Sequence, residues 1–225
     1  IYMTQMTKVP APVALRQTQR EITRMGHIAA DNLKRALDCF FNYSTSKAAS
    51  VRSHEESVNI LNHLIADAMV DLRSLDLSPE NMRRVSMMTI AVTDIERLSD
   101  HAENIVEYIE QMNAKKAEMS EAARKELLDM SQDALDAVYL ALDIFEKDDY
   151  SKLDQIEILE QHVDDHEKDL INNHIERIMN SMCNPLGGVI FSDLVTDLER
   201  CSDHAINLAY ALKERPSELD APKLV

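Results

Sequence analysis

Apolar residues recur every three or four positions along most of the chain, which is the spacing of one face of an α-helix. In the first long stretch this face holds Ile22, Met25, Ala29, Leu33 and Ala36. The same spacing returns after each polar break. The pattern therefore predicts six helices, over residues 12–43, 47–75, 79–112, 121–146 and 150–182, with a sixth that follows the loop at 184–188 and stops before Pro216.

The breaks between these stretches carry residues that start helices. Ser44, Ser78 and Ser120 are N-cap residues, and Pro79 suits a first helical position. Helices of this length span about 45–50 Å, and three such helices joined by short turns form an antiparallel bundle. Residues 1–11 are expected to form a leader, and the residues after Pro216 a polar, frayed tail.

One twelve-residue stretch occurs twice. Thr93–Asn104 and Thr196–Asn207 are identical at 9 of 12 positions and lie 103 residues apart. A fainter match at an offset of 105 relates the earlier helices, for example Ala36–Asp38 and Ala141–Asp143. The chain is therefore an internal duplication. The expected fold is all-α, with two tandem antiparallel three-helix bundles over residues 1–114 and 115–225.

Composition agrees with helices and narrows the function. Among 225 residues there are 3 Gly, no Trp and 4% aromatic residues, which is poor material for sheets. The net charge is −16, so the surface repels nucleic-acid phosphates and anionic lipid and favours a cation or a basic partner.

Cysteine usage and hydropathy indicate where the chain resides. Cys39, Cys183 and Cys201 are odd in number and irregularly spaced, so disulfides are not expected. The expected compartment is a reducing cytoplasm. No apolar run approaches 18 residues, so no segment is expected to insert into a membrane. No signal peptide is visible, and a start at Ile1 suggests a piece excised from a longer protein.

The repeated stretch places oxygen ligands beside its apolar face. With about 100° per residue, Asp100 lies about 40° from Glu96 on the helix, and Glu199 and Asp203 repeat this arrangement. Two carboxylates four residues apart repel each other, so keeping the pair twice makes sense if a cation neutralises it. Carboxylate oxygens suit magnesium, calcium, manganese or iron.

A facing helix can complete each site. The best candidates are Glu55 with Asn59 in the first half and Glu160 with Asp164 in the second, again 105 residues apart. His101 and His204 fall about 140° from Glu96 and Glu199. They are therefore expected outside the stripe, at the surface or behind the ligands.

Other interpretations stay open. Carboxylates four residues apart are common in so acidic a chain, and Arg97 and Arg200 could pair with them in a metal-free structural scaffold. There is no Glu-x-x-His sequence and no glycine-rich phosphate loop, and no nucleophile lies within a catalytic motif, so an enzyme is not expected. A metallohydrolase ranks last, because neither a general base nor a substrate pocket can be named.

Asp94–Ala102 and Asp197–Ala205 resemble the signature D-L-E-R-x-x-D-H/Y-A of the PhoU family, and the similarity extends over the whole chain. The resemblance implies bound metal ions, as an iron or zinc cluster, with manganese or magnesium as alternatives. Position by position it assigns the ligand pairs Glu96 and Asp100, Glu199 and Asp203, and Glu160 and Asp164. Glu55 departs from the pattern, because Asn59 follows it in place of Asp, so the first site is expected to be weaker or to hold fewer ions.

The segment Pro10–Leu15, followed by Arg20–Met25, looks more specifically like the cytoplasmic PhoU-like domain that follows the membrane part of bacterial sodium/phosphate cotransporters. The resemblance implies a regulator of phosphate uptake without turnover, at the cytoplasmic face of the inner membrane. Its partner would be a membrane transporter portion, of the same or another chain, or a sensor kinase. A homo-oligomer is compatible with this role. The alternative within the family is a free-standing repressor of a phosphate two-component system.

Overall fold

The computed structural model describes residues 9–213, and these residues form six α-helices and no strand. The all-α prediction is confirmed. The helices are α1 (Ala11–Phe41), α2 (Thr45–Arg73), α3 (Pro79–Lys115), α4 (Glu121–Lys147), α5 (Leu153–Met179) and α6 (Pro185–Tyr210). Within the described range none of them combines the length and the apolarity that a membrane span requires.

Most helix starts lie where the sequence placed them, because the capping residues act locally. The side chains of Ser44, Ser78, Ser120 and Asn184 each accept a hydrogen bond from the backbone N–H three residues later. Each cap satisfies one of the N–H groups that a helix start leaves without a partner. The helices are thus joined by short, well-defined turns.

The fifth helix is shorter at both ends than the predicted range 150–182. Tyr150–Lys152 form a 3-10 turn, where the Asp149 carboxylate accepts a hydrogen bond from the Ser151 N–H at 3.2 Å. At the other end the chain leaves the helical conformation before Met182, since Ser181 has a left-handed φ of 56°. Residues 1–8 of the expected leader and the expected tail after Pro216 lie outside the described residues.

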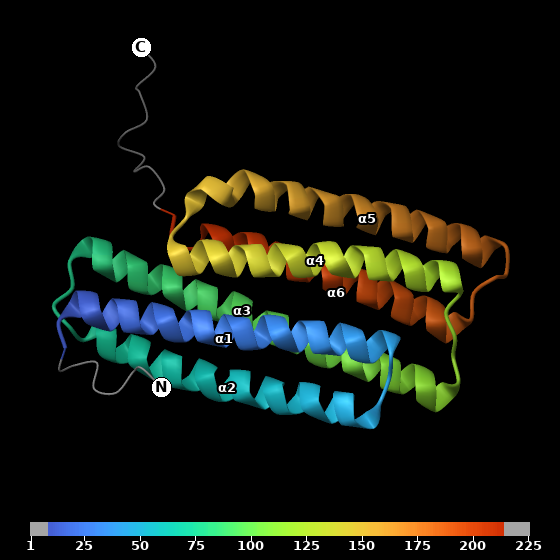
Figure 1. The fold of residues 1–225 in the computed structure, drawn as a ribbon, viewed down its shortest axis with the longest axis horizontal. Coiled ribbons are helices and arrows are strands. Elements are labelled where there is room, and N and C mark those ends of the chain that lie inside the picture. The colour runs from blue at the N-terminus through green and yellow to red at the C-terminus, as the bar shows by residue number, and fades with distance from the viewer. Residues whose placement is uncertain (1–8, 214–225) are drawn as a thin grey trace, which may run out of the picture.

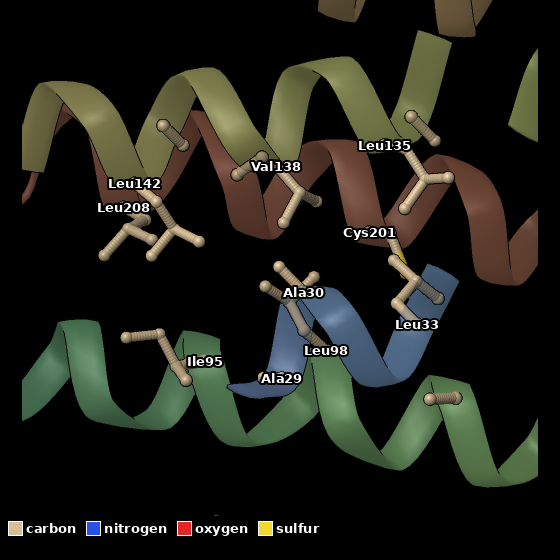
Figure 2. Close-up of a cluster of buried hydrophobic side chains, with 14 of the residues drawn as sticks. Ala29, Ala30, Leu33, Ile95, Leu98, Leu135, Val138, Leu142, Cys201 and Leu208 are labelled. Atoms are coloured by element: carbon tan, nitrogen blue, oxygen red, sulfur yellow. The ribbon is translucent and has the colours of Figure 1, made fainter. Parts of the chain in front are cut away.

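Helices α1, α2 and α3 pack on one another as one bundle, and α4, α5 and α6 form the second (Figure 1). The two bundles meet where α1 contacts α4 and α3 contacts α6, which leaves α2 and α5 on the outside. A single hydrophobic core runs through both bundles. Figure 2 shows its central part, where Leu33, Leu98, Val138 and Cys201 come from four different helices. The domain boundary at 114/115 stays a prediction.

Candidate metal centre

The repeated motif lies on α3 and on α6, and each of these helices is buried on the side that the periodicity predicted. Val92, Ile95, Ser99, Ala102 and Val106 are all buried. Glu96, at the edge of this face, is half-buried, and Asp100 is exposed. On α6, Glu199 is likewise half-buried and Asp203 exposed. The stripe of carboxylates beside the core is therefore present in both repeats.

In the first repeat, α2 brings Glu55 opposite the stripe on α3. Burial raises the pKa of Glu55, and the charges of Glu103 and Asp100 add to the shift. Burial and the neighbouring Asp100 raise the pKa of Glu96 as well. The Asn59 amide donates a hydrogen bond to the Glu55 carboxylate. Glu103 was not predicted as a ligand, although it lies one helical turn beyond Asp100 on α3.

The second repeat is more acidic. Burial raises the pKa of Glu160, followed by the charges of Asp164 and Asp203. The pKa of Glu199 is raised to about 7, first by burial and then by Asp203, Glu167 and Asp164. Glu167 is a second carboxylate that was not predicted. Asp164 and Glu167 each add a charge where the first repeat has an amide, Asn59 and Asn62, so the stronger repulsion in this repeat follows from two residues.

These carboxylates fit a cation by their chemistry. Their oxygens are ligands for hard cations and also for zinc. Burial first and then their mutual charge raise the pKa of Glu55, Glu96, Glu160 and Glu199. Among the ion pairs of residues 9–213, none involves Arg97 or Arg200. The described residues do not, however, present three His, Cys, Asp or Glu side chains already converged as a metal cage. The seven ligands and the metal stay predictions.

Of the two positions expected for His101 and His204, the surface position is wrong, and a position behind the ligands stays a prediction. His101 Nδ1 lies 3.0 Å from Asp197 Oδ1, and His204 Nδ1 lies 2.9 Å from Asp94 Oδ1. The two imidazole rings stack at 5.7 Å between centroids. We refer to these four residues as the His–Asp cluster. It joins α3 to α6 between the repeats, whereas the sequence interpretation considered each bundle alone.

A signal for this second buried face was present in the sequence. Asp94, Leu98, His101 and Ile105 all lie about 140–200° from Glu96, on the side of the helix next to the first apolar face and opposite Glu96. Leu98 and Ile105 are fully buried. The apolar surface of this helix is therefore too broad to be covered by one bundle alone, so Leu98 and Ile105 could have placed His101 at an interface.

The His–Asp cluster is symmetric in its pairing but unequal in its hydrogen bonds. Asp197 Oδ2 also accepts a hydrogen bond from the Tyr108 hydroxyl at 2.8 Å. Asp94 Oδ2 is buried and has no hydrogen-bond partner in the described structure. The reason is a substitution between the repeats, because the position that corresponds to Tyr108 at the offset of 103 is Ala211.

Two helical repeats, each with a carboxylate cluster and joined through their motif helices, define an all-helical tandem-repeat protein with paired acidic sites. The family model described as "PhoU domain" matches residues 22–109 and again residues 127–212. The chain therefore belongs to the PhoU family, and the resemblance on which the sequence interpretation relied is confirmed at that level.

Solved structures agree on the fold. The crystal structure of PhoU from Pseudomonas aeruginosa superposes with a TM-score of 0.84 at 19% identity, over 90% of this chain and 97% of that chain. PhoU from Streptococcus pneumoniae, described as a phosphate transport system regulatory protein, superposes with a TM-score of 0.80 at 19% identity, over 90% of this chain and 95% of that chain. A PhoU-like protein from Shewanella oneidensis is more distant, with a TM-score of 0.62 at 15% identity. No curated protein sequence matches the chain.

Proposed function

We propose that this chain is a metal-binding regulatory domain that modulates phosphate uptake. The observation that carries the proposal is the carboxylate cluster present in each repeat of a PhoU-family chain, with the pKa of Glu55, Glu96, Glu160 and Glu199 raised. Repulsion that is kept twice is explained by a cation that removes it. The role in phosphate uptake comes from relatives such as the S. pneumoniae regulatory protein.

In this proposal each cluster links an outer helix to a motif helix. The first metal site would use Glu55, Glu96 and Asp100, and the second Glu160, Asp164, Glu199 and Asp203. An iron or zinc cluster, or manganese or magnesium, would supply positive charge that neutralises them. The chain's own contribution is to hold α2 against α3 and α5 against α6, so that metal occupancy changes how firmly the outer helices are held. No turnover is part of this role.

Elemental analysis of the protein, purified without chelator, tests the metal. We expect at least one metal ion per chain, and less in Glu96→Gln and Glu199→Gln, each of which removes one charged ligand. Glu176→Gln, on an exposed part of α5, is the matched control. Fewer than one metal per chain, unchanged by the two motif substitutions, would favour the structural scaffold without metal.

We place the chain at the cytoplasmic face of the inner membrane, as the regulatory part of a sodium/phosphate cotransporter. The support is the segment Pro10–Leu15 and its resemblance to such domains. The rival is a free-standing regulator of a phosphate two-component system, favoured by the match to 97% of the P. aeruginosa PhoU chain. Co-purification from native membranes distinguishes them, since a transporter portion is expected in the first case and a sensor kinase in the second.

A further inference from the structure

A polar cleft of about 710 Å3 lies at the end of the molecule where α1 and α3 begin and α4 ends, on the left in Figure 1. It spans both repeats and lies away from the carboxylate clusters. The described residues that line it include four basic side chains, Arg16, Arg20, Arg84 and Lys147. This is unusual in a chain with 40 acidic and 24 basic residues.

The floor of the cleft is fixed by hydrogen bonds between three helices. Gln19 on α1 is 9% exposed, and its Nε2 donates to the Phe145 carbonyl of α4 at 2.9 Å. Its Oε1 accepts from Arg84 Nη2 of α3 at 2.8 Å. The same Arg84 nitrogen lies 3.1 Å from Asp148 Oδ2. Arg84 is therefore held in place through one nitrogen, and its other guanidinium N–H groups stay available to a ligand.

Part of the charge around the cleft is already paired. Asp148 pairs with Arg84, and Glu146 lies 3.4 Å from His27. Lys147 pairs with Asp143. Arg16 and Arg20 take part in no hydrogen bond or ion pair with another described residue. A neutral His27 does not cancel the charge of Glu146, so Glu80 and Glu146 both remain. The lining therefore carries four basic against three acidic side chains, a net charge of +1 in a chain whose net charge is −16.

The duplication does not explain Arg16 or Arg84, whereas the charge of Arg20 is kept at Lys125 in the second repeat. At the offsets of 105 and 103, the positions that correspond to Arg16 and Arg84 are Glu121 and Gly187. Arg16 and Arg20 are also four residues apart on one helix, where like charges destabilise it slightly. The fold uses Arg84 to join three helices but makes no such use of Arg16 and Arg20, whose placement a bound anion would explain.

We propose that this cleft binds a phosphate monoester of about the size of a nucleoside monophosphate. The planar arginine fork matches the geometry of phosphate oxygens and binds them through paired hydrogen bonds. A cleft of 710 Å3 is within the range of small-molecule sites and much larger than one phosphate ion. The Thr23 hydroxyl and the Asn81 amide, which also line the cleft, are suited to hydroxyl groups of the ligand.

Isothermal titration of the chelator-treated protein with adenosine monophosphate tests this assignment. Removing metal keeps the experiment independent of the carboxylate clusters and hence of the proposed regulatory role. At low ionic strength we expect one site, and binding weaker by at least about tenfold in R16Q/R20Q. Glu80→Gln should tighten binding. Arg35→Gln, exposed on the same helix outside the cleft, and Glu199→Gln should leave it unchanged.

Inorganic phosphate and adenosine serve as further probes. We expect phosphate to compete with adenosine monophosphate and adenosine not to bind. Because Arg16 and Arg20 are exposed, their substitution should leave the melting temperature unchanged. Adenosine that binds as tightly as the monophosphate, or binding that survives in R16Q/R20Q, would overturn the proposal. It would also be overturned if neither phosphate compound bound more tightly than about 10 mM.

Discussion

The fold raises the pKa of the Glu199 carboxyl group close to neutral pH. Its pKa rises from an ordinary 4.5 to about 7, because burial and the charges of Asp203, Glu167 and Asp164 favour the neutral form. In the unfolded chain the group ionises at the lower pH. As the pH rises from about 4.5 to 7, the metal-free folded state therefore loses stability relative to the unfolded state.

Glu199→Gln keeps the side chain neutral at every pH and tests this argument. In chelated protein we expect the variant to melt at a higher temperature than the parent chain at about pH 8, and at a similar temperature at about pH 4. Thermal unfolding followed by circular dichroism measures both. Glu176→Gln should show no such pH dependence relative to the parent, and an equal difference at both pH values would contradict the role of Glu199.

The Tyr108 hydroxyl donates a hydrogen bond to Asp197, whereas Asp94, the other aspartate of the His–Asp cluster, has no such donor. Burial and the hydrogen bond to Asp197 raise the pKa of this phenol. Tyr108→Phe removes a donor to a buried carboxylate, so we expect a loss of about 1–2 kcal/mol in the free energy of unfolding, measured in urea. Tyr139→Phe removes an exposed bond to Asp31 and should cost about 0.5 kcal/mol or less. Equal costs would show that the buried position of Asp197 contributes nothing.

Among individual residues, those that act within one helix turn were predictable and those that act between repeats were not. Glu96 and Asp100 follow from their spacing on one helix. The partner of His101 could not be predicted, because Asp197 is 96 positions away along the chain. Glu103 and Glu167 were missed since their effect depends on how α2 and α5 lie against the motif helices.

At the scale of helices, the absence of a side chain at Gly26 on α1 makes room for Leu142 of α4. A Cβ atom on Gly26 would lie 2.3 Å from Leu142 Cδ2 and 3.3 Å from Ile95 Cδ1. Gly26→Leu should push these helices apart and lower the free energy of unfolding by about 2–3 kcal/mol, despite the better helix propensity of leucine. Denaturation in urea measures the change.

Lys34→Leu on the exposed side of α1 is the matched control for Gly26→Leu and should change the free energy of unfolding by about 0.5 kcal/mol or less. Leu142→Ala should recover part of the loss by making room for the new side chain. A Gly26→Leu protein as stable as the control would mean that the two repeats tolerate a wider separation than their packing indicates.

For the molecule as a whole, the His–Asp cluster couples the two motif helices. The two rings stack, so replacing one histidine changes the surroundings of the other. A cycle with His101→Ala, His204→Ala and the double variant should give an interaction free energy of about 0.5–3 kcal/mol in urea. His27 is exposed and far from the cluster in sequence. The free-energy change of His27→Ala should therefore add to that of His101→Ala or His204→Ala without an interaction term. Additivity between His101 and His204 themselves would rule out the coupling.

The amino-acid sequence by itself determined the six helices, their capped starts, the duplication and the carboxylate stripe, because each of these depends on residues close together in the chain or on a repeated pattern. Only the tertiary structure decided that α3 packs against α6, that two histidines pair with aspartates of the other repeat, and that Arg16 and Arg84 line one cleft with the end of α4. These features join segments tens of residues apart, and helical periodicity carries no information on which distant face a buried side will meet.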